Sequence, residues 1–270
     1  MKKVLSDLCK VMFSALLLMM LAPGAFAQTF DPGRGIQAWE GTINGKIPVT
    51  VWFDVRDGLI AGEIVYLNTK EKQPIALLGQ VNWDDGRLEF NEVLPNGVVS
   101  GIMLGVIRGN SFSGTWIAPA KTVERGSRYE TIDGKSYPLR LTRVDNSGIG
   151  FSRYFSWFYD QNPIAGEYRY SWGDNRAEGK MRVTATGRGS IEYEINTHVG
   201  APSFNMADVG PETVTLEKNR VVVELADNCA FEILLFNGFA AIRHIDDKIC
   251  WGYFGMNANV DGLYLKTVRQ

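Results

Sequence analysis

The sequence predicts an all-β protein built of two tandem antiparallel β-barrel-like units. Three observations predict this fold class. Short runs of alternating or continuous apolar residues recur along the chain, and glycine, asparagine and aspartate separate them. No long stretch repeats its apolar residues at the period of a helix. Many short strands at close spacing, with turn residues between them, are typical of antiparallel barrels and sandwiches.

Residues 1–27 have the pattern of a secretory signal peptide. Three lysines lie within the first ten residues, an apolar run follows, and the segment closes on Ala-Phe-Ala. The apolar core, residues 11–21, is shorter than the roughly 20 residues of a membrane-spanning helix. We therefore expect cleavage before Gln28 and a soluble exported chain, in the periplasm or outside the cell, with no membrane insertion after cleavage.

The charge of the chain argues against two classes of partner. The formal net charge is −2 at pH 7. Removing residues 1–27 takes away three lysines and one aspartate, which changes the charge by −2 and leaves −4. Nucleic acids and anionic membranes both require a concentrated basic face, and no run of like charge occurs in this chain. The remaining 243 residues (270 − 27) suffice for one large β-domain or two of ordinary size.

Residues 28–144 are predicted to form the N-terminal β-barrel-like unit. A strand is predicted at 46–55, where Ile47, Val49, Val51 and Phe53 stand at alternate positions and so lie on one face. Further strands of this unit are predicted at 58–67, 86–93, 111–118 and 137–144. The acidic segment before Arg87 is predicted to be a hairpin turn and not a calcium loop, because Arg87 stands where such a loop needs glycine.

Residues 145–163 are predicted to connect the two units. Their middle is too aromatic for a flexible linker, with rings at Phe151, Tyr154, Phe155, Trp157, Phe158 and Tyr159. Large rings are usually buried, so we expect them to pack between the two units. The alternative is an exposed aromatic platform, with Trp157 as a candidate contact, that binds a glycan or a protein.

Residues 164–270 are predicted to form the C-terminal β-barrel-like unit. The predicted strands are 166–172, 179–186, 189–197, 212–218, 219–227, 229–236, 239–245, 249–256 and 262–268. The irregular segment 197–210 between two of these strands contains glycine and proline and is predicted to be a loop.

Two cysteines, Cys229 and Cys250, remain after Cys9 leaves with the signal peptide. An even number of cysteines in an exported chain predicts a disulfide, because oxidising compartments permit it. We expect Cys229 to begin one strand and Cys250 to begin the third strand of the same meander, so that both lie at one end of the sheet. An Asp-Asp-Lys turn at 246–248 would separate the second strand from the third.

A set of short motifs in the C-terminal unit carries a resemblance to known proteins. The motifs are Gly-x-Tyr at 166–168, Cys-x-Phe-Glu-Ile at 229–233, Phe-Ala-x-Ile at 239–242, Cys-x-Gly at 250–252 and Asp-Gly-x-Tyr-x-Lys at 261–266. Their order resembles a largely uncharacterised type of exported bacterial β-domain, and the layout is similar to the compact barrels of periplasmic C-type lysozyme inhibitors. The resemblance implies a small barrel that binds other proteins. In the N-terminal unit, Ser-Gly-Thr-Trp at 113–116 is similar to strands of avidin-type and lipocalin-type barrels.

Residue patterns that carry catalysis or metal binding are missing from the sequence. There are two histidines, His198 and His244, and neither has the spacing of a zinc site. No glycine-rich nucleotide loop and no Gly-x-Ser-x-Gly elbow occurs. A Cys–His nucleophilic pair would need a free thiol, which a disulfide removes. We therefore expect no metal, no cofactor and no enzymatic activity.

Carboxylates on strands form the remaining candidate for chemistry, because an acid pair can hydrolyse a glycoside. Most of them alternate with apolar residues and are expected to face solvent. These acids are Glu40, Asp54, Glu63, Glu89, Glu192, Glu194, Glu224 and Glu232. A secreted acid-pair hydrolase stays as an alternative function, as does a small-ligand carrier with a cavity inside one barrel.

The sequence favours an exported non-enzymatic binding or inhibitor-type protein of the bacterial cell envelope. Its expected partner is an envelope or extracellular protein or a glycan. Loops at the ends of β-scaffolds usually carry binding residues. We therefore place the candidate contacts in the 197–210 loop, at His198, Phe204 and Asn205, together with Trp157 of the connector.

Overall fold

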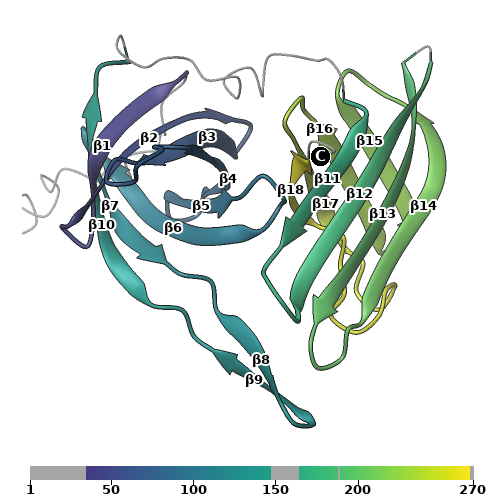
Figure 1. Cartoon of the computed structure of the whole chain (residues 1–270). Helices are drawn as coiled ribbons and strands as arrows, with labels where there is room; N and C mark the ends of the chain where they lie inside the picture. The colour runs from purple at the N-terminus through teal and green to yellow at the C-terminus, as the bar shows by residue number, and fades with distance from the viewer. Residues whose placement is uncertain (1–34, 147–163, 188, 268–270) are drawn as a thin grey trace, which may run out of the picture. The chain divides into compact units, whose positions relative to one another are not determined.

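The computed structural model describes residues 35–146, 164–187 and 189–267, and the named elements there are 18 strands (Figure 1). The strands form two eight-stranded antiparallel sheets and one hairpin. The predicted all-β fold with two barrel-like sheets is confirmed. Among the described residues there is no helix long and apolar enough to cross a membrane.

The first sheet is a closed barrel with the strand order β1-β10-β7-β6-β5-β4-β3-β2 (Figure 1). Its strands are β1 (Gln37–Ile43), β2 (Ile47–Arg56), β3 (Leu59–Tyr66), β4 (Pro74–Asn82), β5 (Arg87–Val93), β6 (Val99–Arg108), β7 (Ser111–Ile117) and β10 (Ser136–Val144). Between β7 and β10 the chain forms a separate hairpin of β8 (Lys121–Arg125) and β9 (Arg128–Ile132). The barrel closes because β1 pairs with both β2 and β10.

Aromatic side chains fill the middle of the closed barrel. Trp39, Phe53, Phe90 and Phe112 are each at most 2% exposed. Their ring centroids follow one another at 6.3, 5.0 and 6.1 Å. Glycine at position 62 lets β3 bend against β2, since a Cβ there would lie 2.0 Å from the carbonyl oxygen of Trp52. The strands thus curve around a core of contacting rings.

The second sheet has the order β14-β13-β12-β11-β18-β17-β16-β15 and is barrel-like but open (Figure 1). Its strands are β11 (Gly166–Ser171), β12 (Arg176–Gly187), β13 (Ser190–Gly200), β14 (Met206–Thr215), β15 (Arg220–Ala226), β16 (Cys229–Leu235), β17 (Phe239–Ile249) and β18 (Gly262–Thr267). The edge strands β14 and β15 are consecutive in the chain, and only an isolated bridge between Glu217 and Arg220 closes the turn that joins them. The interior is apolar, with Tyr168, Met181, Tyr193, Phe231, Ile233 and Tyr264 in one core cluster.

Several predicted boundaries in the second sheet are wrong. A turn was predicted at residues 246–248, but these residues lie inside β17, which continues to Ile249. The predicted strand 249–256 is a series of turns after its first residue. The predicted loop 197–210 is mostly strand, because β13 continues to Gly200 and β14 begins at Met206. The predicted signal peptide, residues 1–27, and the aromatic residues of the predicted connector, including Trp157, lie outside the described residues.

Candidate binding surface

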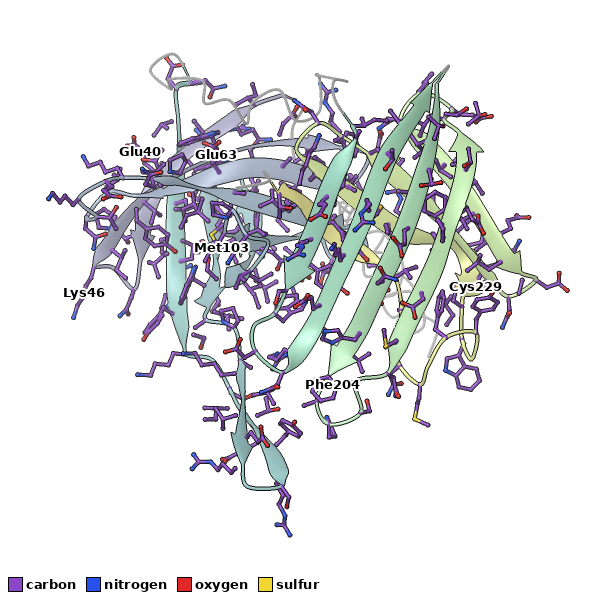
Figure 2. All side chains as sticks on the ribbon, turned by 45° about the vertical axis from the view of Figure 1, so that its right-hand side comes forward. Glu40, Lys46, Glu63, Met103, Phe204 and Cys229 are labelled. Atoms are coloured by element: carbon purple, nitrogen blue, oxygen red, sulfur yellow. A yellow bond between two sulfur atoms is a disulfide. The ribbon has the colours of Figure 1, made fainter. Side chains whose placement is uncertain are left out.

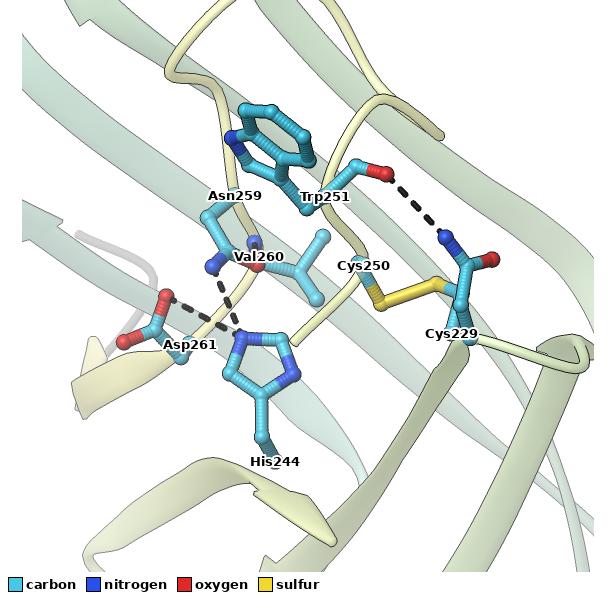
Figure 3. Close-up of a disulfide and its surroundings, with 8 residues drawn as sticks. Cys229, His244, Cys250, Trp251, Asn259, Val260 and Asp261 are labelled. Atoms are coloured by element: carbon cyan, nitrogen blue, oxygen red, sulfur yellow. Dashed lines mark hydrogen bonds and ion pairs between the residues drawn. A yellow bond between two sulfur atoms is a disulfide. The ribbon is translucent and has the colours of Figure 1, made fainter. Parts of the chain in front are cut away.

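The disulfide between Cys229 and Cys250 is present, as predicted (Figure 3). The structural reason differs from the predicted one. Cys229 begins β16, and Cys250 directly follows the end of β17, so the bond joins two adjacent antiparallel strands. Cys229 is paired in register with Ile249, and the Cα atoms of the two cysteines are 3.9 Å apart. Both cysteines are buried and oxidised, so neither offers a thiol to His244 or His198.

A bulge in β17 replaces the predicted Asp-Asp-Lys turn. The register of β16 and β17 shifts between the pair Cys229–Ile249 and the pair Phe231–His244. Four residues of β17 therefore stand opposite Ala230, and one of them, Asp246, has a φ of 52°. A bulge bends its strand and redirects the chain beyond it. Here it precedes a segment of turns at residues 250–260, which we call the disulfide loop.

Backbone hydrogen bonds fix the disulfide loop at several points. The amide of Cys250 donates to the carbonyl oxygen of Asn228 at 3.0 Å, and the amide of Tyr253 donates to that of Cys250 at 3.0 Å. The amide of Gly255 donates to the carbonyl oxygen of Met206 at 3.1 Å, which ties the loop to the start of β14. A loop bonded at both ends and in its middle has little freedom to lose when it binds a partner.

Asparagine side chains add further bonds to the loop backbone. Asn228 donates through Nδ2 to the carbonyl oxygen of Trp251 at 3.1 Å (Figure 3), and Asn205 donates in the same way to that of Met256 at 2.7 Å. Asn259 accepts the amide of Val260 on Oδ1 at 2.8 Å, which directs its Nδ2 at His244.

His244 is a support of the disulfide loop. Its Nε2 lies 2.7 Å from the side-chain nitrogen of Asn259 and 3.9 Å from Asp261 Oδ1 (Figure 3). Because Asn259 Nδ2 is a donor, Nε2 accepts this hydrogen bond. The carbonyl oxygen of Asn259 accepts the hydroxyl of Thr197 at 2.6 Å. Cys229, His244 and Cys250, which lie close together in the sequence, are therefore a disulfide and a histidine that both hold one loop.

Five large apolar side chains on and beside this loop face solvent, and we call them the apolar tip. Their exposed fractions are 55% for Met206, 55% for Ile249, 84% for Trp251, 47% for Tyr253 and 77% for Met256. Trp251 and Met256 are the two most exposed large apolar residues in the described part of the chain. Soluble proteins seldom leave such side chains grouped in water without a binding role.

Inward-facing residues of the same loop explain why its backbone stays in place. Ala258 and Val260 are buried in the core of the second sheet, and Phe254 packs against that core. The loop therefore has an inner set of apolar side chains that anchors it and an outer set that it displays. Anchoring inside and display outside are what a preformed contact loop requires.

Exposed carboxylates lie on the segments next to the apolar tip. Asp227 precedes the Asn228 that bonds the loop, and Asp246 and Asp247 lie in the β17 bulge. Asp208 is two residues beyond Met206 along β14. Lys248, the one lysine of the bulge, already pairs with Glu224 at 3.4 Å. The segments around the tip thus carry an excess of negative charge.

The structure places three of the four predicted contacts, His198, Phe204 and Asn205, near this surface but does not make them its centre. Asn205 is half-buried and bonds the loop. Phe204 is 39% exposed in the turn after β13 (Figure 2), and its ring centroid lies 6.0 Å from that of His198 on β13. Trp251, Tyr253 and Met256 were missed, because their apolar run was interpreted as a strand. The two glycines at 252 and 255 were the signal for turns.

Two buried glutamates are the described acids with shifted pKa values, and they occur in different sheets. Glu92 of β5 is 2% exposed inside one end of the closed barrel. Its Oε1 accepts the hydroxyl of Tyr66 at 2.7 Å and the indole N–H of Trp116 at 2.6 Å. Burial raises the pKa of the Glu92 carboxyl, and these hydrogen bonds offset the effect only in part. Glycine at 101 leaves room for the arrangement, since a Cβ there would lie 2.7 Å from Glu92 Oε2.

Glu232 of β16 is 7% exposed on the outer face of the open sheet. Arg220 of β15 and Arg243 of β17 both donate to its carboxylate from the two neighbouring strands. Burial alone would raise the pKa of Glu232, but the hydrogen bonds and charges of the two arginines outweigh it and lower the pKa. The expectation that strand acids face solvent is wrong for Glu232, and also for Asp54 and Glu63, which are 6% and 0% exposed.

Comparisons with known proteins assign no family to the chain. No family model matches it, and no curated protein matches it. Among solved structures, the chain is similar to a crystal structure of a protein with unknown function from the DUF3598 family of Nostoc punctiforme. The identity is 11% over 81% of this chain and 82% of that chain, with a TM-score of 0.23. A TM-score this low indicates nothing about shared function, so the fold described above rests on the strand pairing of this chain.

Proposed function

We propose that the chain is an exported, non-enzymatic binding protein of the bacterial cell envelope that binds a protein partner through the apolar tip. The observation that carries this proposal is Trp251, which is 84% exposed on a loop whose backbone is bonded on both sides of it. Tryptophan is the residue most typical of the few side chains that dominate a protein interface.

The composition of the tip favours a protein over a glycan as the partner. Tryptophan, tyrosine and methionine are enriched at the cores of protein interfaces, and charged residues are depleted there. Met206, Ile249 and Met256 are aliphatic or thioether groups that offer a sugar neither a flat ring nor a hydrogen bond. The exposed carboxylates next to the tip fit the polar rim of such an interface and favour a partner with basic groups around an apolar pocket.

Two further observations support export and binding. A disulfide is compatible with an oxidising compartment. The C-terminal motifs resemble those of periplasmic C-type lysozyme inhibitors, which are small exported barrels that bind other proteins.

The buried acids with shifted pKa values, Glu92 and Glu232, bond to tyrosine, tryptophan and arginine, and this gives the hydrolase alternative no support.

The test compares two exposed tryptophans in the same protein. The chain without residues 1–27 is immobilised and exposed to envelope and secreted proteins of the source organism, and captured proteins are identified and purified. Trp251→Ser is expected to weaken binding of the captured protein by at least about tenfold. Trp83→Ser is the matched control, because Trp83 is 58% exposed in the closed barrel, and it should bind as the parent chain does.

Three outcomes would contradict the proposal. Capture that is equally strong with Trp251→Ser would place the contact elsewhere on the chain. Loss of capture with Trp83→Ser alone would place it on the closed barrel. Binding on a glycan array that Trp251→Ser abolishes would keep the tip as the site and replace the protein partner by a glycan.

A further inference from the structure

The methionines of the described chain fall into two sharply different groups. Met103, labelled in Figure 2, is 1% exposed inside the closed barrel. Met181 is 0% exposed in the core of the open sheet. Met206 and Met256 are 55% and 77% exposed, and both belong to the apolar tip. The other four methionines of the sequence lie within residues 1–27. Half of the methionines expected in the exported chain therefore stand in its candidate contact surface.

The two exposed methionines come from segments that are bonded to each other. The carbonyl oxygen of Met206 accepts the amide of Gly255, the residue directly before Met256. The carbonyl oxygen of Met256 accepts the side chain of Asn205, the residue directly before Met206. This reciprocal pair of bonds holds the two segments that carry the methionines side by side, and both side chains face solvent there.

We propose that Met206 and Met256 form a modification site at which a peroxide-type oxidant inactivates the apolar tip. The step needs hydrogen peroxide or a related two-electron oxidant. A sulfur lone pair attacks one peroxide oxygen, the O–O bond breaks, a sulfur–oxygen bond forms, and the second oxygen leaves as water after proton transfer. Sulfur is oxidised and the peroxide is reduced. The product, methionine sulfoxide, is polar where the thioether was apolar.

The consequence for binding rests on the proposed function, but the modification does not. Sulfoxides at two of the five side chains of the tip would remove much of its apolar character. The disulfide at the base of the loop does not respond to the same oxidant, because Cys229 and Cys250 are already paired. The tip would thus lose its apolar surface while the loop that carries it stays in place.

The first measurement is peptide mapping after graded exposure of the folded chain without residues 1–27 to hydrogen peroxide. Met206 and Met256 are expected to oxidise at least about tenfold faster than Met103 and Met181, since exposure controls access of the oxidant. In denaturant the four rates should converge. Comparable rates in the folded chain at an exposed and a buried methionine would overturn the proposal.

The second measurement reads the apolar surface on a phenyl column in high salt, which needs no partner protein. The oxidised parent chain should elute earlier than the untreated one. Met206→Leu/Met256→Leu keeps two apolar side chains without thioethers, so peroxide should leave its elution unchanged, while the control Met103→Leu should shift as the parent does. Unchanged elution of the oxidised parent would refute inactivation of the tip. If peroxide shifts the elution but the capture experiment finds no protein whose binding depends on Trp251, the modification stands and the proposed function is refuted.

Discussion

The closed barrel and the open sheet bury a glutamate in opposite ways. In the barrel, Glu92 is surrounded by neutral donors, Tyr66 and Trp116, and burial favours its protonated form. In the open sheet, Glu232 lies between two arginines, which favour its ionised form. The difference arises from shape: a barrel interior leaves no route for a long cationic side chain to keep its head in water, whereas the outer face of a sheet does.

The same contrast extends to the large apolar side chains. The barrel encloses its rings in a continuous row from Trp39 to Phe112. The open sheet displays Trp251 and Met256 on a loop that depends on a disulfide and on asparagine side chains. The barrel thus keeps these rings in its core, whereas the open sheet uses additional bonds to hold the loop that displays its exposed apolar side chains.

The largest expected effect is therefore that of the disulfide. Cys229→Ser/Cys250→Ser should lower the free energy of unfolding by about 2–5 kcal/mol, because the bond joins residues that are 21 positions apart in the chain. Thermal unfolding of the parent chain with and without reductant provides the measurement. The near-ultraviolet circular dichroism of the aromatic row in the barrel serves as the internal reference, because the disulfide lies in the other sheet.

A free-thiol titration checks directly whether Cys229 and Cys250 are paired. The chain without residues 1–27 should show no reactive thiol before reduction and two after it. Two thiols in the unreduced protein, or unchanged stability of the double variant, would contradict the assigned role of the bond.

The next effect in size concerns Glu232. Glu232→Gln removes the charge that two arginines share and should lower the free energy of unfolding by about 1–3 kcal/mol at neutral pH, a moderate value because both guanidinium groups are half-exposed. The folded pKa of Glu232 lies below the unfolded one, so its contribution is present above the unfolded pKa and is lost as pH falls through the folded pKa. Urea unfolding at several acidic pH values should show this slope in the parent and not in the variant.

The smallest effect, with the opposite sign, is expected for Glu92. Its folded pKa is raised, so the unfolded chain releases the proton first, and stability falls as pH rises from the unfolded pKa towards the folded pKa. Glu92→Gln keeps an oxygen that accepts from Tyr66 and Trp116 but cannot ionise. It should equal or exceed the parent in stability at neutral pH, within about 1 kcal/mol. A loss clearly larger than about 1 kcal/mol at neutral pH would contradict the expectation that burial favours the protonated form of Glu92.

Much of the strand content could be predicted from sequence, because alternation reports the two faces of a strand. Ile47, Val49, Val51 and Phe53 do lie on one strand, β2, and all of them except Ile47 are fully buried. The disulfide was predictable from the cysteine count and the predicted export. Its geometry was not, because the bulge in β17 depends on Asp246 adopting a left-handed backbone, which residue type alone does not dictate.

The candidate site was less predictable than the fold. Residues Ile249 to Met256 are apolar enough to resemble a buried strand, and only packing shows that Phe254 faces the core while Trp251 and Met256 face solvent. The burial of Glu232 was hidden for a related reason. Alternation correctly places it on the outer face, but Arg220 and Arg243 cover it from neighbouring strands, a contact that depends on the sheet order.

The most direct test of the apolar tip as the contact surface is site-specific photo-cross-linking in living cells. A photoreactive phenylalanine replaces Trp251 in one variant and Trp83 in the other. We expect a defined protein adduct from position 251 and none of that mass from position 83. The same adduct from both positions, or an adduct from position 83 alone, would contradict the assignment of the contact surface to the apolar tip.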